Sequence, residues 1–191
     1  MAYFPMMVNI TGKPVLLVGG GKEGLQKIEV LSMFYPKITL ISPDAFPEAA
    51  EKADIYHNRS FVDSDLLDHS YSLVVAATDN RKVNMHISEL ARKKSIPVNV
   101  VDDIELCTFI FPAIVKDEDI VCAISSSGKC PYIVQYLKRI IKGVFPTNIG
   151  RINVQMGEYR EYIKKEIKDS RERKELLRHR LDELLGNKID L

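Results

Sequence analysis

The chain has 191 residues, of which 46% are apolar and 28% are charged, and its net charge is +1. This balance is typical of a folded globular protein and excludes a disordered chain. The near-neutral charge, without a concentrated stripe of lysine and arginine, predicts that nucleic acid is not a partner.

The sequence lacks several motifs that would indicate a membrane, secreted or metal-binding protein. The apolar runs, such as 14–21, are far shorter than the roughly 18 residues of a membrane-spanning helix, and the N-terminus lacks the pattern of a secretory signal. We therefore expect a cytoplasmic protein with no membrane partner. Cys107, Cys122 and Cys130 form no CxxC pair, and the four histidines are scattered, so we expect no metal site. We expect the three cysteines to be buried small apolar residues, and reactive thiols are the alternative.

Residues 13 to about 112 alternate between two patterns. Helical periodicity covers 22–34 and 81–94, and runs rich in β-branched residues lie at 15–18, 38–42, 54–58, 72–77 and 97–101. Strands that alternate with helices predict βαβ units and a parallel sheet covered on both faces. The predicted fold class is therefore α/β.

A glycine motif directly follows the first predicted strand. Gly19, Gly21 and Gly24 form G-x-G-x-x-G, in which the first glycine permits a tight turn, the second lets a pyrophosphate approach the backbone, and the third lets helix and strand pack closely. The helix that begins near Lys22 would face the phosphates with its positive end, and Lys22 is predicted to contact the cofactor. We predict an NAD-binding Rossmann domain, a doubly wound parallel sheet, over residues 1–112. The alternative is a merely structural glycine turn.

Three further residues, at the ends of two strands, are expected to contact the cofactor. Ser42 ends the second strand, where an acidic residue often binds the ribose 2′-hydroxyl, and no arginine there suits a 2′-phosphate, so we expect NAD rather than NADP. Thr78 and Asp79 end the fourth strand and are expected near the nicotinamide. Either could instead cap the following helix.

Residues 113–145 depart from the alternation of strands and helices. Two short strand-like runs precede a helix, and Pro131 suits its first turn, with Ser127 and Gly128 available at its start. This β-β-α segment is too short for a core of its own, so we expect it to pack on the sheet or on another copy of the chain. In residues 146–191, apolar residues recur at three- and four-residue steps over two successive stretches. These predict two helices, which form the predicted C-terminal helical domain.

Six motifs together are more specific than the glycine loop. In this order and spacing they resemble the precorrin-2 dehydrogenase module, found alone or at the N-terminus of sirohaem synthase. The resemblance covers residues 3–145 and, more loosely, the helical tail. It rests on GGGKEG at 19–24, AATDN at 76–80, Asn84, NVVDD at 99–103, CTFIFPAIV at 107–115 and AISSSGKCP at 123–131.

The resemblance implies an NAD-dependent oxidoreductase that converts the tetrapyrrole precorrin-2 to sirohydrochlorin in sirohaem biosynthesis. It also implies a homodimer, with 113–145 as the dimerisation segment. Asp102 matches the family's essential aspartate, and Ser126 matches a serine at the tetrapyrrole site that is phosphorylated in some members. The chain departs from the family at Ser127, where a glycine is usual, and at Gly24, which is often alanine.

The residues themselves agree with these roles. Asp102 follows the fifth strand beside Asp103, and paired carboxylates raise one another's proton affinity, which favours a general base. A turn-capping role is the alternative, and we favour it for Asp103. Ser126, Ser127 and Lys129 precede a helix N-terminus, a place suited to anions, and are predicted to bind the substrate's carboxylates.

Three functions stay open at this point. The first is dehydrogenation alone, and the second adds insertion of ferrous iron by the same pocket. The third is a regulatory Rossmann module that binds NAD as a signal, which would leave CTFIFPAIV and AISSSGK unexplained.

Overall fold

The computed structural model describes residues 3–186, and the chain divides into two compact units, 1–111 and 112–191. The elements of the first unit are β1 Pro14–Val18, α1 Lys22–Ser32, β2 Lys37–Ile41, α2 Pro47–Lys52, β3 Ile55–His57, α3 Ser64–Leu67, β4 Leu73–Ala76, α4 Arg81–Lys93, β5 Val98–Val100 and the short 3-10 helix η1 Ile104–Leu106. Those of the second unit are β6 Ala113–Asp117, β7 Ile120–Ile124, α5 Pro131–Val144, α6 Ile149–Glu166 and α7 Ser170–Leu185.

The first unit is a five-stranded parallel sheet in the order β3-β2-β1-β4-β5. The order reverses between β1 and β4, because β2 and β3 lie on one side of β1 while β4 and β5 lie on the other. This is the doubly wound Rossmann arrangement, whose ligands bind at the carboxyl edge beside the reversal. The predicted fold class is confirmed, and all five strands lie at the predicted positions.

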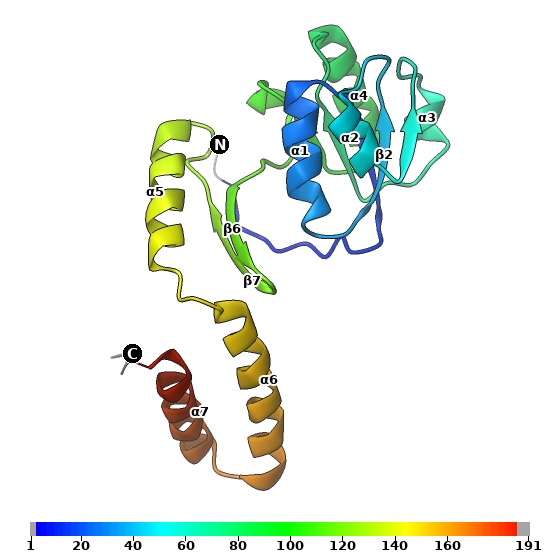
Figure 1. Ribbon diagram of the computed structural model, residues 1–191. Coiled ribbons are helices and arrows are strands. Elements are labelled where there is room, and N and C mark those ends of the chain that lie inside the picture. The colour runs from blue at the N-terminus through cyan, green and yellow to red at the C-terminus, as the bar shows by residue number, and fades with distance from the viewer. Residues whose placement is uncertain (1–2, 187–191) are drawn as a thin grey trace. The chain divides into compact units, whose positions relative to one another are not determined.

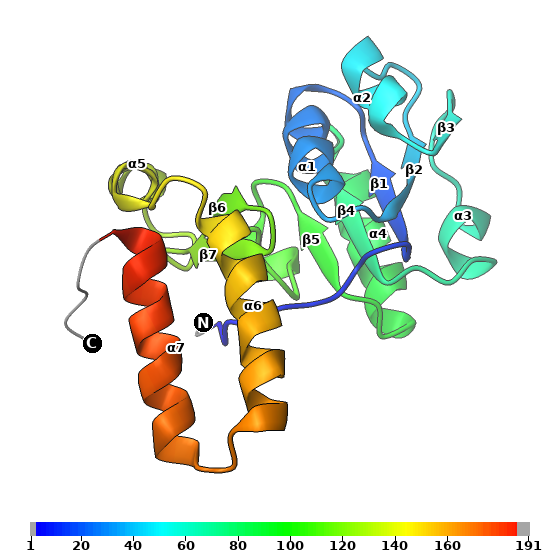
Figure 2. The ribbon, with the colours of Figure 1, turned by 60° about the horizontal axis from the view of Figure 1, so that its bottom comes forward.

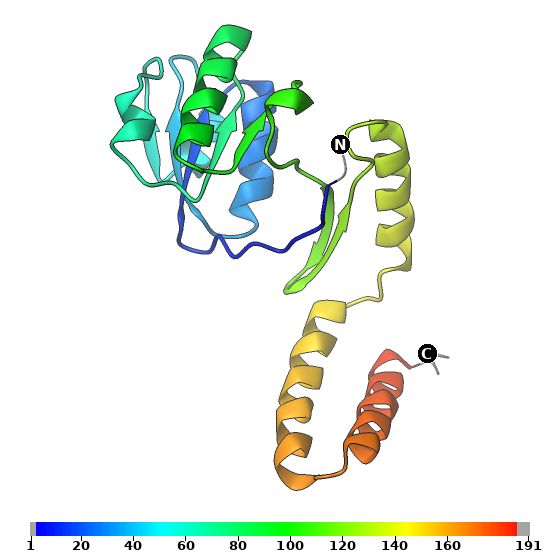
Figure 3. The same cartoon turned by 180° about the vertical axis from the view of Figure 1, so that it is seen from behind.

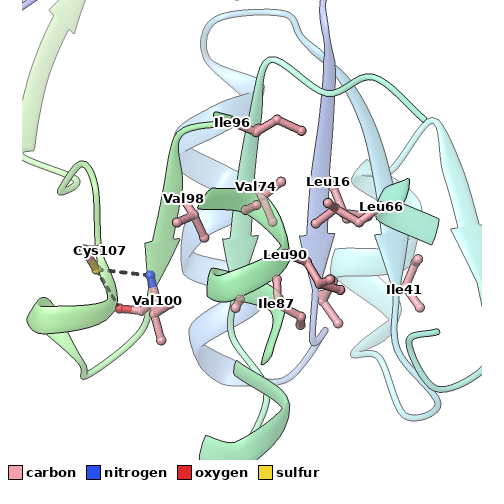
Figure 4. Packing of buried hydrophobic residues seen from close by; sticks show 13 residues of the cluster. Leu16, Ile41, Leu66, Val74, Ile87, Leu90, Ile96, Val98, Val100 and Cys107 are labelled. Atoms are coloured by element: carbon pink, nitrogen blue, oxygen red, sulfur yellow. Dashed lines mark hydrogen bonds between the residues drawn. The ribbon is translucent and has the colours of Figure 1, made fainter. Parts of the chain in front are cut away.

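Helices cover both faces of this sheet. Helix α4 covers one face (Figure 3), where Leu16 and Val74 pack with Ile87 and Leu90 of this helix (Figure 4). Helices α1 and α2 cover the other face (Figure 1). There, strand residues pack with Ile28 of α1 and Ala49 of α2. Neighbouring residues of β1 thus enter opposite cores, which explains why its sequence is a continuous apolar run rather than an alternating one.

Two glycines allow α1 to lie close to the sheet. Gly19 has a φ of +99°, and a Cβ there would overlap the carbonyl group of Ala77 at the end of β4. A Cβ on Gly24 would overlap the carbonyl oxygen of Gly19. Because both obstacles are backbone atoms, neither can rotate away. The packing role that the motif predicts for Gly24 is therefore present in the geometry.

Gly24→Ala is expected to destabilise the first unit by about 1–3 kcal/mol, the usual cost of forcing one extra carbon into a packed site. Urea denaturation of wild type and variant measures this. Gly157→Ala in α6 is the matched control, because nothing lies within 4 Å of a Cβ at Gly157. That control should raise stability by about 0.5–1 kcal/mol, the gain of alanine over glycine within a helix. Equal effects at the two positions would contradict the packing role of Gly24.

The second unit joins a small hairpin to three helices. Strands β6 and β7 pair antiparallel, with Val115 opposite Cys122, and α5 contacts both strands. The backbone N–H of Gly150 donates to the carboxylate of Asp117 at 2.8 Å, which ties the start of α6 to the hairpin. Helices α6 and α7 lie side by side and antiparallel (Figure 2). Pro131 begins α5 as predicted. No helix within residues 3–186 is long and apolar enough to cross a membrane.

Candidate cofactor and catalytic site

A cleft of about 640 Å³ lies at the carboxyl ends of the strands, lined by the loops that follow all five. It brings together most of the residues predicted to bind cofactor or act in catalysis. Gly24 is not in the lining and packs behind the loop. The predicted residues in the lining are Gly19, Gly21, Lys22, Ser42, Thr78, Asp79 and Asp102.

The glycine loop presents backbone, rather than side chains, to this cleft. Gly21 is the N-cap of α1, and no side chain caps the N–H groups of the helix's first turn. A Cβ built on Gly21 would meet no atom within 4 Å. Exposed donors, open space and the positive end of an 11-residue helix are what a diphosphate requires. The loop therefore fits a dinucleotide.

Gly20 is a functional residue that the sequence reasoning missed. A Cβ there would lie 2.5 Å from the Cβ of Ala45 and 2.8 Å from its Cα, so only glycine fits beside the loop that follows β2. The run of three glycines was a visible signal, but the G-x-G-x-x-G pattern leaves its middle position unspecified.

The segment after β2 contributes one carboxylate and no cation to the cleft. Ser42 is 5% exposed, and its carbonyl oxygen accepts a hydrogen bond from the Tyr56 hydroxyl at 3.1 Å. Asp44, two residues on, also lines the cleft and is exposed. The basic lining residues within the described chain are Lys22 and Arg81, and neither follows β2. A 2′-phosphate would therefore meet a carboxylate and no cation here.

The loop after β3 adds Ser60 and Phe61 to the lining, and the sequence reasoning missed both. An ion pair fixes this loop: the guanidinium of Arg59 bonds both carboxylate oxygens of Asp65, which also accepts the N–H of Val62 at 2.9 Å. The hydrogen bond from Arg59 lowers the pKa of Asp65 below its usual value. Asp65 therefore stays ionised and keeps the loop in place at neutral pH.

The loop after β4 is held by Asn84, which is buried in α4. Its side-chain oxygen accepts from the Thr78 hydroxyl at 2.6 Å, and its amide donates to the Thr78 carbonyl oxygen at 2.8 Å. The alternative that Thr78 or Asp79 caps α4 is wrong. The N-cap is Asn80, whose side chain accepts the N–H groups of Lys82 and Val83. Asp79 is therefore left exposed in the lining.

The two neighbouring aspartates after β5 have different surroundings. Asp103 bonds Arg81, with its Oδ2 2.7 Å from Nη2 and 3.0 Å from Nε. The Asp103 carboxylate is therefore engaged by a cation. Asp103 is the N-cap residue of η1, as favoured, but its side chain makes no capping hydrogen bond there. Asp102 is exposed, and its carboxylate bonds no residue between 3 and 186.

Asp102 also has an unusual backbone. Its φ is +57°, in the left-handed region that few residues other than glycine adopt, although aspartate tolerates it better than most. Such conformations cost free energy and cluster at functional sites. The turn thus holds a free carboxylate at the carboxyl edge of the sheet.

Comparison with known proteins places these features in a family. A family model described as putative NAD(P)-binding matches residues 6–113, more than half of the chain. This chain belongs to that NAD(P)-binding family. The match covers the cleft and every loop that lines it.

Two siroheme synthases are among the relatives that resemble this NAD(P)-binding chain. The one from Vesicomyosocius okutanii subsp. Calyptogena okutanii is 37% identical over 168 residues, which cover 86% of this chain and 36% of the relative. The one from Ruthia magnifica subsp. Calyptogena magnifica is 33% identical over 193 residues, which cover 99% of this chain and 40% of the relative. The chain thus spans little more than a third of the length of these relatives.

A solved structure supports the fold of the NAD(P)-binding chain over nearly its whole length. The structure titled SirC, precorrin-2 dehydrogenase, matches with a TM-score of 0.71 and 21% identity, covering 92% of this chain and 87% of that one. At this identity the likeness shows the shared fold. It includes the second unit, which the family model does not reach.

The predicted substrate-binding residues of the NAD(P)-binding chain lie in its second unit. The Ser126 hydroxyl accepts the N–H of Cys130 at 3.1 Å, and Ser127 has a φ of +54°. The N-cap of α5 is Cys130 rather than Ser127 or Gly128. Lys129 follows in the same turn, and its backbone N–H donates to the Ser126 carbonyl oxygen. Their role toward a substrate stays a prediction.

The thiols of the NAD(P)-binding chain are all free. Cys107 is buried, and its sulfur bonds both the N–H and the carbonyl oxygen of Val100 at the end of β5 (Figure 4). Burial raises the pKa of this thiol, which keeps it protonated and unreactive. Cys122 and Cys130 are only half-buried, so the expected burial is wrong for these two. No group of three or more metal-binding side chains lies together within residues 3–186.

Proposed function

We propose that the chain catalyses the NAD-dependent oxidation of precorrin-2 to sirohydrochlorin. The observation that carries the proposal is the convergence of the glycine loop, Ser42, Thr78, Asp79 and Asp102 in one cleft. The names of the relatives, siroheme synthase and precorrin-2 dehydrogenase, support the choice of substrate. A regulatory NAD-sensing module would need no free carboxylate beside the cofactor cleft.

The proposed chemistry removes a hydride and a proton from the tetrapyrrole. Bound NAD would supply the hydride acceptor. Asp102 takes the proton on its carboxylate, which is accessible and not engaged by a neighbouring residue of the described chain. Ser126, Ser127 and Lys129 are proposed to bind the carboxylates of the substrate. The alternative is that the same protein also inserts ferrous iron into the product.

The same cleft supports NAD over NADP. The carboxylate of Asp44 follows β2, and the two lining cations lie elsewhere. A 2′-phosphate placed beside Ser42 would meet like charge, whereas a 2′-hydroxyl could bond the serine. The cytoplasmic location and the absence of membrane and nucleic-acid partners stay predictions.

The proposed function is tested by incubating the purified protein anaerobically with precorrin-2 and NAD. We expect NADH to form in equal amount to the precorrin-2 consumed, with a much slower reaction when NADP replaces NAD. A protein that binds NAD but yields no NADH would overturn the proposal. Repeating the reaction with ferrous ion decides whether sirohaem is also formed.

We also propose that the protein is a homodimer that associates through α5. One side of α5 contacts β6 and β7, while its other side carries exposed apolar side chains. A patch of this kind is typical of an interface. Its members are Tyr132, Ile133, Tyr136, Leu137, Ile140 and Val144, each 39–85% exposed.

Light scattering is expected to give the wild-type protein a mass near twice 21.7 kDa. Ile140→Asp places a charge in the centre of the apolar side and should give the monomer mass. Gln135→Asp is the matched control, because Gln135 lies on α5 away from the apolar side. A wild-type monomer, or an Ile140→Asp variant that remains a dimer, would contradict an interface on α5.

A further inference from the structure

An ion pair between Arg81 and Asp103, two residues that line the cleft, joins one loop to the next. Arg81, at the start of α4, belongs to the loop after β4, and Asp103 belongs to the loop after β5. Two guanidinium nitrogens bond one carboxylate oxygen, at 2.7 and 3.0 Å. The Asp103 side chain is 15% exposed, whereas that of Arg81 is 73% exposed. The pair therefore links the two loops that follow the neighbouring strands β4 and β5.

Asp103 is also fixed through its backbone. Its carbonyl oxygen accepts the N–H of Leu106 at 3.2 Å and the thiol of Cys107 at 3.3 Å. On the other side of the turn, the N–H of Val101 donates to the carbonyl oxygen of Ala76 at 3.0 Å. Asp102 is thus held between two anchored neighbours while its own side chain has no partner within residues 3–186.

This arrangement makes the direction of the Asp102 carboxylate a property of the turn. The left-handed φ of +57° stores strain that the turn would release if one of its anchors were lost. Among these anchors, the ion pair is the one made by the Asp103 side chain, and it connects the turn to the first residue of α4. The bonds from Leu106 and Cys107 come from the chain that follows the turn, and the bond from Val101 joins the end of β5 to the end of β4.

We propose that Arg81 is a positioning residue that acts through Asp103 to hold Asp102 in its reactive orientation. This inference rests on the proposed function of Asp102. In this role Arg81 contacts neither the substrate nor the Asp102 carboxylate that takes the proton. It should therefore affect the rate of the bound complex more than the affinity for cofactor or substrate.

The test compares Arg81→Met with Lys82→Met, which removes a positive charge from the next position of α4. We expect Arg81→Met to lower kcat by about tenfold to a hundredfold, the usual cost of misplacing a reacting group, with KM values within about twofold of wild type. Arg81→Lys, which keeps one charged donor, should recover part of the loss. Lys82→Met should match wild type. The melting temperature should hardly change, because the arginine is largely exposed.

A second measurement needs no substrate. Hydrogen–deuterium exchange of the peptide covering residues 101–107 should be faster in Arg81→Met than in wild type and Lys82→Met. Unchanged exchange, a kcat above about half of wild type, or a loss confined to KM would overturn the inference. If the wild type failed to oxidise precorrin-2, the proposed function would fall, while the exchange result would still decide whether Arg81 holds the turn.

Discussion

Asp102→Asn is expected to lower the rate of precorrin-2 oxidation by about 10² to 10⁴, the usual contribution of a general base. Asparagine keeps the size of the side chain and removes the basic carboxylate. Because the Asp102 side chain bonds no residue between 3 and 186, the substitution should leave the fold, NAD affinity and oligomeric mass unchanged. Steady-state rates at saturating precorrin-2 and NAD, with calorimetric titration of NAD, measure both effects.

Two further substitutions serve as comparisons for Asp102→Asn. Asp68→Asn, on the exposed end of α3, is the matched control and should keep the wild-type rate. Asp103→Asn weakens the bond to Arg81 and should lose about tenfold in rate through the position of the turn. An Asp102→Asn protein that kept more than about half of the wild-type rate would remove Asp102 as the base. A larger loss at Asp103 would assign the role to that residue.

Gly21→Val is expected to raise the dissociation constant of NAD by about a hundredfold or more, because its side chain would occupy the space where a pyrophosphate approaches the backbone. The fold should survive, since nothing lies within 4 Å of a Cβ at this position and its φ of −73° is ordinary for any residue. A small loss of stability, about 1 kcal/mol, follows from placing valine at a helix N-cap. Calorimetric titration with NAD and a thermal melt measure the two quantities.

Gly21→Ala serves as the graded variant for the same site. Its single methyl group should cause an intermediate loss of affinity, whereas a stability defect would be expected at Gly24 instead. Unchanged NAD affinity in a folded Gly21→Val protein would show that the cofactor does not lie against this loop.

The parts of the site that follow from local geometry could be predicted from the sequence. Gly19, Gly21 and Gly24 form a motif whose physics is contained in six residues, and the strand before it is a continuous apolar run. The parallel sheet then brings Ser42, Thr78 and Asp102 to the same edge, because each follows a strand. Their positions at the ends of predicted strands were enough to predict that these residues line the site.

Features that depend on tertiary contacts or on very short segments could not be predicted. Helices α2, α3 and η1 have three to six residues, too few for a helical period to be visible. Thr78, Asp79 and Asn80 are three successive residues that can cap a helix, so composition did not select Asn80. The bond between Arg81 and Asp103 joins residues 22 positions apart, and nothing in the local sequence indicates it.

The central claim is that the cleft holds NAD with its nicotinamide beside Asp102. A crystal structure of the protein with NAD tests this most directly. We predict the pyrophosphate against Gly21 at the start of α1, the adenosine ribose at Ser42, and the nicotinamide between the Thr78–Asp79 loop and the turn of Asp102. A dinucleotide bound outside the cleft, or one whose nicotinamide lies at the Ser42 side, would contradict the account.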